Sequence, residues 1–206
     1  MATEIELKLQ IIGGPEGLMI SKIKECLSGL KIDPQLKVSR LTNTYFDTSL
    51  CQLSELKMAL RIREMAMQNE TLFIQTFKTK GCSVQGLSQR GEWEWPVLSL
   101  SIDASRLLAC EAWPKEVDLN ELHALFETNF IRHQCEFDFQ DSRIELALDQ
   151  GEIKSKDQIE PINEIELELK QGQEGDLISL AGHLKKAIAL APSDISKAER
   201  GYRLHA

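Results

Sequence analysis

Two segments of the chain carry a carboxylate at every second residue. The first is Glu4-Ile5-Glu6-Leu7-Lys8, and the pattern returns as Glu164-Ile165-Glu166-Leu167-Glu168-Leu169-Lys170. This alternation of charged and branched apolar residues predicts strands with one apolar and one acidic face. If the two strands meet, five carboxylates converge, those of Glu4, Glu6, Glu164, Glu166 and Glu168. Such a cluster is tolerated mainly where a divalent cation neutralises it, so the strands predict a metal site.

Basic residues follow the same alternation on other predicted strands. Arg61 and Arg63 lie two residues apart, so both guanidinium groups face one side and can bind adjacent phosphate groups bidentately. Further donors come from Lys8, Lys78, Arg90 and Arg132. Hard divalent cations prefer carboxylate and phosphate oxygens together, which predicts a triphosphate bridged to Mg²⁺ or Mn²⁺. With no obvious serine or cysteine nucleophile constellation, attack of metal-activated water on a terminal phosphoryl group is the simplest reaction.

The rest of the chain supplies the elements that must position these side chains. Strands are also predicted over residues 37–47, 59–64, 71–78, 90–96, 129–139 and 143–149, with Gln150-Gly151 as a tight turn. Helical spacing of apolar residues predicts helices over 15–30, 102–112, 118–126 and 176–190. The fold class is therefore α+β. Charged pairs at i and i+2 on five strands favour an eight-stranded antiparallel closed barrel, with a charged lumen and helices outside, over an open solvated sheet.

Composition narrows the class of protein. The 206 residues, 42% of them hydrophobic, fit a single domain over 1–206. A net charge of −8 disfavours a nucleic-acid scaffold or an anionic membrane as the main partner. The five cysteines form no CxxC pair and their number is odd, which fits reduced thiols. Without a signal-like start or an apolar run of roughly 18 residues, we expect a cytoplasmic protein.

A series of motifs runs in order from residue 4 to residue 202. Besides the two acidic strands it comprises Tyr45-Phe46-Asp47, Leu60-Arg61-Ile62-Arg63, Thr76-Phe77-Lys78, Arg90-Gly91-Glu92-Trp93-Glu94, Arg132, Asp149-Gln150-Gly151-Glu152-Ile153 and Ser196-Lys197-Ala198-Glu199-Arg200-Gly201-Tyr202. Together they resemble the CYTH superfamily, the triphosphate tunnel metalloenzymes. The resemblance implies an eight-stranded antiparallel tunnel, open at both ends, that binds a triphosphate along its axis with a divalent metal.

The resemblance also implies roles for individual residues. The metal ligands would be Glu4, Glu6, Asp149, Glu164, Glu166 and Glu168. The phosphates would be bound by Arg61, Arg63, Lys78, Arg90, Arg132 and Lys197. Lys8 would lie close to the reacting phosphate and, with Glu6 and Glu166, form the catalytic group. The resemblance implies a pair of metal ligands from the second acidic strand, which contains three glutamates. Glu166 ranks first among them, and the choice between Glu164 and Glu168 for the second ligand stays open.

The motifs around Trp93 and Lys197 look most like those of bacterial inorganic triphosphatases, which implies hydrolysis of tripolyphosphate to pyrophosphate and phosphate with Mg²⁺ or Mn²⁺. The alternatives are a class IV adenylate cyclase that forms cyclic AMP and pyrophosphate from ATP, a thiamine triphosphatase, and a non-catalytic polyphosphate- or nucleotide-binding module. A CHAD domain often follows in relatives, whereas this sequence ends soon after Tyr202, which suits a free-standing domain or an excised fragment equally. A homodimer is compatible with the sequence.

Overall fold

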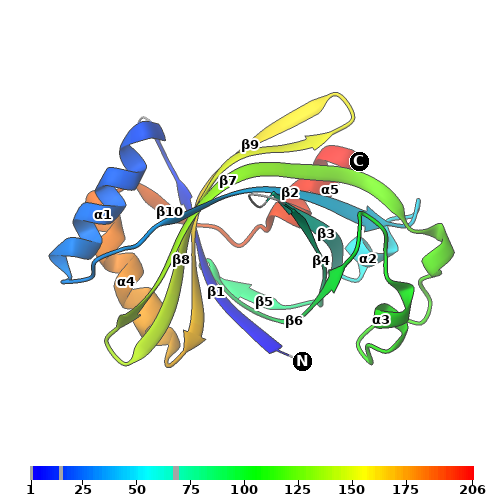
Figure 1. Ribbon diagram of the computed structural model, residues 1–206, viewed down its shortest axis with the longest axis horizontal. Coiled ribbons are helices and arrows are strands. Elements are labelled where there is room, and N and C mark those ends of the chain that lie inside the picture. Colours follow the sequence, from blue (N-terminus) through cyan, green and yellow to red (C-terminus); the bar gives the residue numbers. More distant parts are fainter. Residues whose placement is uncertain (1, 14–15, 67–69) are drawn as a thin grey trace.

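The computed structural model describes residues 2–13, 16–66 and 70–206, and within these ranges eight antiparallel strands close into a barrel (Figure 1). Around the barrel the strands follow the order β1 (Ala2–Ile11), β9 (Gln158–Gln171), β8 (Ser142–Ser155), β7 (His123–Phe139), β2 (Lys37–Asp47), β3 (Ala59–Ala66), β4 (Thr71–Lys78) and β6 (Leu87–Val97). Pairing of β6 with β1 closes the ring. Two short strands, β5 (Cys82–Val84) and β10 (Leu190–Pro192), pair with β6 and β1. The predicted fold class is confirmed.

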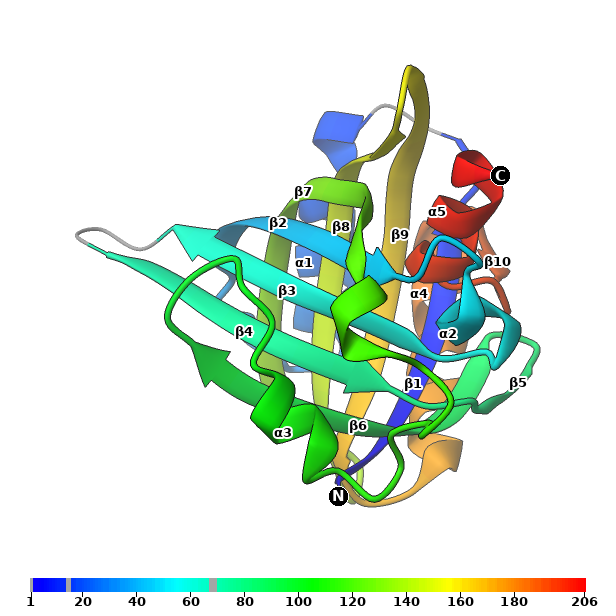
Figure 2. The same ribbon diagram turned by 90° about the vertical axis from the view of Figure 1, so that its right-hand side faces the viewer.

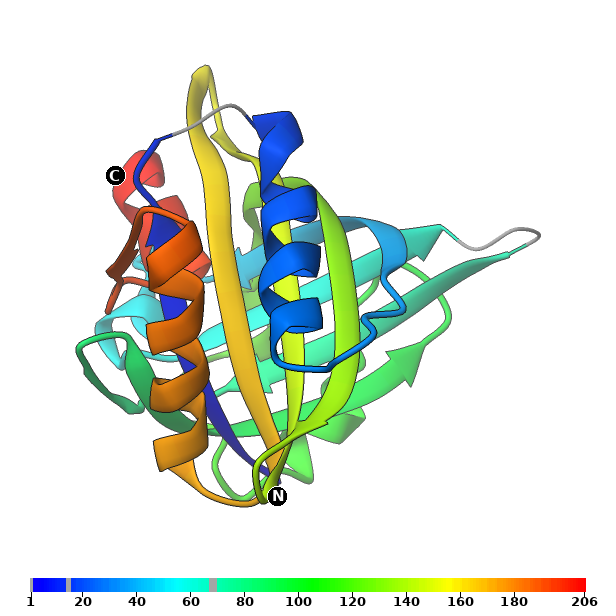
Figure 3. The ribbon, with the colours of Figure 1, turned by 90° about the vertical axis from the view of Figure 1, so that its left-hand side faces the viewer.

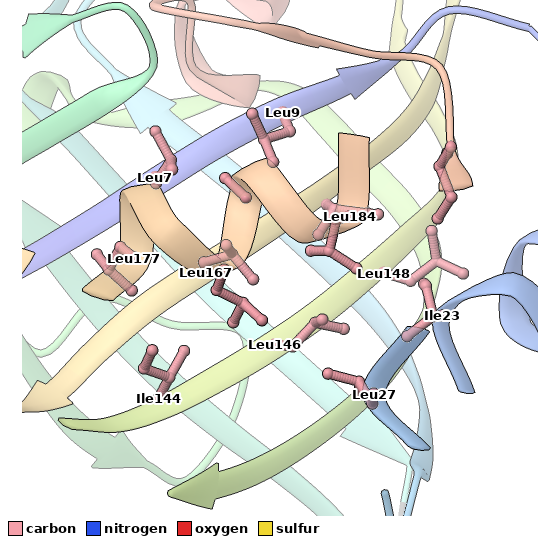
Figure 4. Close-up of a cluster of buried hydrophobic side chains, with 14 of the residues drawn as sticks. Leu7, Leu9, Ile23, Leu27, Ile144, Leu146, Leu148, Leu167, Leu177 and Leu184 are labelled. Carbon is pink, nitrogen blue, oxygen red and sulfur yellow. The ribbon is translucent and has the colours of Figure 1, made fainter. Parts of the chain in front are cut away.

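The outer apolar face of β1, β8 and β9 is covered by two helices, α1 (Met19–Gly29) and α4 (Glu174–Ala187) (Figure 3). Leu7, Leu146 and Leu167 point outward from these strands and pack under Leu177 and Leu184 of α4 (Figure 4). Burial of each such leucine stabilises the fold by about 1.5–3 kcal/mol. Because side chains alternate between the two faces of a strand, burial of the leucines on the outside places their charged neighbours on the inside. Both predicted helices are present, but their bounds differ. The first follows a 3-10 turn over Glu16–Leu18, and Pro15, where it was expected to begin, lies outside the described residues. The second ends at Ala187, because Leu190 pairs with β1 as part of β10.

A second apolar layer covers β3, β4 and β6. Phe77 packs against Trp93 and Trp113, with ring centroids 5.9 and 5.1 Å away, beneath the segment that follows β6 (Figure 2). The helix predicted over 102–112 is shorter, because α3 (Ala104–Leu108) ends where the chain turns to bury Trp113 against the barrel. Trp93 and Trp95 therefore belong to an apolar layer that stabilises the outside of the barrel wall.

The helix predicted over 118–126 is wrong. Residues Leu119–Glu121 form one 3-10 turn, η2, and β7 begins at His123. Residues 123 and 124 pair with Asp47 and Phe46 of β2, and an irregularity in the register leaves Leu125 without a partner before Phe126 pairs with Tyr45. The bulge lets Leu125 and Phe126 both be buried, so strand pairing overrides an apolar spacing that fits a helix equally well.

The turn predicted at Gln150-Gly151 is also wrong, because both residues lie inside β8. A Cβ on Gly151 would collide with the carbonyl oxygen of Asn129 and with Phe130 on the neighbouring strand. The glycine thus allows β7 to approach closely. The chain reverses only after Ser155, which pairs with Gln158.

One end of the barrel is flanked by α5 (Lys197–His205) and α2 (Gln52–Glu55) (Figure 2). The side chain of Ser196 accepts a hydrogen bond from the Glu199 N–H, and the Glu199 carboxylate accepts one from the Ser196 N–H, which fixes the start of α5. Gly201 lies against the Phe126 ring with no room for a Cβ. These contacts hold Lys197 at the barrel lumen. No helix in the described residues is long and apolar enough to span a membrane.

Candidate functional site

The barrel encloses a cavity of about 290 Å³, which we call the tunnel. Among the described residues eight cationic and seven acidic side chains line it, although the chain as a whole is strongly acidic. Most predicted site residues are among them: Glu4, Glu6, Lys8, Arg61, Arg63, Lys78, Arg90, Arg132, Glu166, Glu168 and Lys197. Asp149 and Glu164 are 0% and 2% exposed and lie in the wall, in contact with Lys197. The fold therefore brings all the predicted site residues together.

Glu4 of β1 is held by two cations, Arg90 of the neighbouring strand β6 and Lys78 of β4, the next strand beyond it. Lys78 Nζ and Arg90 Nε donate to its two carboxylate oxygens, each at 2.8 Å. Burial opposes ionisation of Glu4, but Lys78 and Arg90 outweigh it and hold the pKa of this carboxyl well below its ordinary value. Glu4 is thus a charged, fully engaged carboxylate.

Glu6 occupies a different environment. It pairs across strands with Glu168, and Glu168 pairs with Glu145, so three carboxylates form a row across β1, β9 and β8. Burial raises the pKa of Glu168, Glu4 and Glu145 add to the effect, and Lys170 at 2.8 Å opposes it. Glu6 Oε1 is buried and accepts no hydrogen bond from the described residues, although Lys8 Nζ lies 3.4 Å away. Among the described residues this row of three carboxylates therefore has one acceptor without a hydrogen bond and two neighbouring ammonium groups, those of Lys8 and Lys170.

Asp149, Glu164 and Glu166 form a second carboxylate group, with one oxygen of each within 4.8 Å of the others. The ammonium of Lys197 lies between them, 2.7 Å from Asp149, 2.5 Å from Glu164 and 2.8 Å from Glu166. The ammonium donates hydrogen bonds to Glu164 and Glu166 and forms an ion pair with Asp149. Arg132 adds contacts of 2.6 Å to Asp149 and Glu166. Burial opposes protonation of Lys197, but the three acids raise its pKa well above the ordinary lysine value.

Of the cationic side chains that line the tunnel, Arg61 and Arg63 have the weakest contacts with carboxylates. The nearest carboxylate oxygens to Arg61, on Glu92 and Glu94, lie at 3.9 and 4.0 Å, and its buried Nε has no partner among the described residues. Arg63 donates to the amide oxygen of Asn43 at 2.9 Å. Burial, followed by repulsion from Arg61 and Arg132, lowers the pKa of Arg63 to about 10. Glu92 and Glu94 approach Arg61 only to 3.9 and 4.0 Å, so an anion that accepts hydrogen bonds from these guanidinium groups would be stabilised here.

Tyr45, Glu145 and Lys170 line the tunnel without having been assigned a role from the sequence. Tyr45 pairs across strands with Arg61 and stacks on Phe126, with ring centroids 4.6 Å apart. Burial opposes ionisation of its hydroxyl, but Arg61 lowers the pKa below the ordinary tyrosine value. The alternation of side chains along a strand could have indicated Glu145, because it lies four residues before Asp149 and therefore on the same face of β8.

Comparison with known proteins places this geometry in context. The CYTH domain profile matches residues 2–202. The inorganic triphosphatase of Haemophilus influenzae is 36% identical over 164 residues, which cover 80% of this chain and 46% of that protein, so the chain spans about half the length of this relative. The structure of HpAC1 from Hippeastrum, described as revealing a dominant triphosphatase activity, superposes with a TM-score of 0.70 at 21% identity, covering 97% of this chain and 95% of the other. PH1819 of Pyrococcus horikoshii gives 0.62 at 14% identity, covering 96% and 98%.

Proposed function

The chain belongs to the CYTH domain family, and on that premise we propose that it is a metal-dependent hydrolase of inorganic tripolyphosphate. The observation that carries the proposal is a pair of unsatisfied groups in one tunnel. Among the described residues, buried Glu6 Oε1 accepts no hydrogen bond and buried Arg61 Nε donates none. A divalent cation would bind the carboxylate, and the phosphate oxygens that such a cation prefers as further ligands would accept from the guanidinium. The name of the Haemophilus relative supports the same substrate class.

The residues present fit a hard divalent cation such as Mg²⁺ or Mn²⁺, since the available donors are carboxylate oxygens. We propose that the cation is held by carboxylates drawn from Glu4, Glu6, Asp149, Glu164, Glu166 and Glu168. When bound, it supplies Lewis acidity toward phosphate oxygens and lowers the pKa of water. Among the described residues Glu6 and Glu168 each contact one ammonium, Lys8 at 3.4 Å and Lys170 at 2.8 Å. Glu164 and Glu166 each contact Lys197 and a guanidinium as well, so the first pair is better prepared for this role.

In the proposed reaction Arg61 and Arg63 bind the triphosphate and hold it along the tunnel, where their parallel placement on β3 orients neighbouring phosphate groups. Lys78, Arg90, Arg132 and Lys197 add positive charge around it. Lys8 lies in the same cavity and stabilises charge on the reacting phosphoryl group. The oxygen of water bonds to the terminal phosphorus, the bridging P–O bond breaks, and pyrophosphate leaves with the electron pair while the water proton is released.

Purified protein incubated with tripolyphosphate, ATP or thiamine triphosphate, with and without Mg²⁺ or Mn²⁺, tests the proposal. We expect fastest phosphate release from tripolyphosphate, dependent on metal and abolished by a chelator. Phosphate release from none of the three compounds would refute it. Formation of cyclic AMP and pyrophosphate from ATP, resolved by product chromatography, would assign a cyclase instead.

A further inference from the structure

Lys8 lies at the point where β1 exchanges one strand partner for another. Residues 2–7 of β1 pair with β6, and residues 9–11 pair with β10. Between these two registers, the Lys8 N–H donates to the Gly86 carbonyl at 2.9 Å, and the Lys8 carbonyl accepts from the Ser193 N–H at 3.1 Å. Both backbone polar groups of Lys8 are therefore bonded to residues just outside the neighbouring strands.

The turn that contains Gly86 lies directly against Lys8. Gln85 and Gly86 join β5 to β6 with φ values of 53° and 87°, as expected for a tight two-residue hairpin. Gly86 is buried, and a Cβ at this position would lie 2.5 Å from the Lys8 carbonyl oxygen. The position of this turn therefore decides where the backbone of Lys8 lies.

Asp194 links the two segments that hold Lys8. Its Oδ1 accepts hydrogen bonds from the Gly86 N–H and from the Ser83 hydroxyl, each at 2.7 Å. The Gly86 N–H, and after it the Ser83 hydroxyl, lowers the pKa of the Asp194 carboxyl. Asp194 directly follows Ser193, and β5 and β10 lie at the same side of the barrel (Figure 2). One carboxylate oxygen thus joins the β5–β6 turn to the segment after β10.

The side chain of Lys8 depends on this backbone for its position. It lines the tunnel, is 7% exposed, and its ammonium lies 3.4 Å from Glu6. A displacement of about 1 Å at a reacting centre can cost about 100-fold in rate. Asp194 itself is exposed and does not belong to the tunnel lining, so it acts on the centre through other residues.

We propose that Asp194 is a positioning residue for Lys8, because its carboxylate oxygen locks together the two segments that bond the Lys8 backbone. The inference rests on the proposed function and adds to it the means by which the Lys8 ammonium is held at the reacting phosphoryl group. Arg61 and Arg63 lie on β3, away from this junction, so binding of the triphosphate should depend little on Asp194.

The first test compares Asp194→Ala with Asp194→Asn in steady-state hydrolysis of tripolyphosphate. Both hydrogen bonds end on Oδ1, so asparagine keeps a carbonyl acceptor there and removes only the charge. We expect Asp194→Ala to lower kcat about 10-fold with KM within about 3-fold, and Asp194→Asn to keep kcat within about 3-fold. Asp157→Ala, in the exposed turn between β8 and β9, is the matched control and should change neither constant.

The second test repeats Asp194→Ala in a Lys8→Ala background. If Asp194 acts through Lys8, the second substitution should lower kcat no further. A 10-fold loss in both backgrounds would assign Asp194 to the stability of the fold and overturn the inference. Equal losses in the alanine and asparagine variants would assign the effect to the charge of Asp194, and an unchanged kcat in Asp194→Ala would exclude any role in positioning.

Amide hydrogen exchange followed by NMR tests the same link without turnover. In Asp194→Ala the Lys8 amide should exchange at least about 10-fold faster, whereas the Ile62 amide on β3 should keep its rate. Unchanged exchange at Lys8 would refute the inference. If the protein hydrolyses no triphosphate, the proposed function fails by itself, and faster exchange confined to the junction would still show that Asp194 holds Lys8.

Discussion

Replacement of Glu6 by glutamine should make the protein more stable and nearly inactive. Glu6 is 5% exposed, faces Glu168 in register and has an oxygen without a hydrogen-bond donor among the described residues. An unsatisfied buried polar group costs about 1–3 kcal/mol, and more when charged. Glutamine removes one of three neighbouring negative charges and can donate to Glu168. Part of the gain is offset because Lys8 loses its partner at 3.4 Å. The net stabilisation should be about 1–2 kcal/mol.

For a domain of this length, 1 kcal/mol corresponds to about 2–4 °C in Tm, so the Glu6→Gln variant should melt about 2–8 °C higher in the presence of a chelator. Activity should move the opposite way. Loss of groups that merely orient metal ligands costs about 10–100-fold, so loss of a direct ligand should lower turnover by at least about 100-fold. Stability gained together with activity lost is the expected signature of strain retained for function.

The assay is calorimetry with a chelator and with Mn²⁺, combined with phosphate release from tripolyphosphate. Glu25→Gln, on the exposed face of α1, serves as the matched control and should change neither property. The reasoning is refuted if Glu6→Gln lowers Tm under chelation and keeps the Mn²⁺-induced rise in Tm. That result would mean that Glu6 is satisfied in the folded protein and does not hold the metal.

Three further perturbations follow from the same geometry. Arg61→Ala should raise KM for tripolyphosphate by about 10–100-fold, the worth of a buried charge-assisted hydrogen bond, and change kcat less; exposed Arg40→Ala is the control, and equal KM values in both variants would exclude Arg61 from binding. Gly201→Ala should destabilise the fold by about 1–3 kcal/mol, measured by denaturant unfolding, because its Cβ would collide with Phe126. The pKa of Glu4 is lower in the folded protein than its ordinary 4.5, so its contribution to stability is present above that value and is lost as the pH falls below it. Glu4→Gln should flatten this acid limb in pH-dependent melting, and an unchanged limb would contradict the pairing with Lys78 and Arg90.

The sequence was sufficient for the barrel and for most of its lining, because a period of two assigns every residue of a strand to a face. It was insufficient to predict which charged side chains lie next to one another. In the second acidic strand, a slip of two residues against β1 keeps Glu164, Glu166 and Glu168 on the same face, so alternation cannot choose the register. The structure pairs Glu6 with Glu168 and Lys8 with Glu166. Helical spacing failed over residues 118–126 for a related reason, since the competing strand partner, β2, lies far away in the sequence.

We expect the two carboxylate groups to contribute unequally to metal binding, because the protein supplies more of its own cations to the group of Asp149, Glu164 and Glu166. Asp149, Glu164 and Glu166 surround Lys197, and Arg132 and Arg200 add further positive charge. Phe130 lies 5.2 Å from the Lys197 ammonium, and such apolar surroundings lower the local dielectric constant and so strengthen these ion pairs. A divalent cation entering this group must displace Lys197 or pay for its repulsion. At the row of Glu6, Glu168 and Glu145 it meets a buried acceptor that has no hydrogen bond among the described residues, with the Lys8 ammonium 3.4 Å away. The free energy of metal binding should therefore be gained mainly at Glu6 and Glu168, while Lys197 ties α5 to the wall that bears the second group.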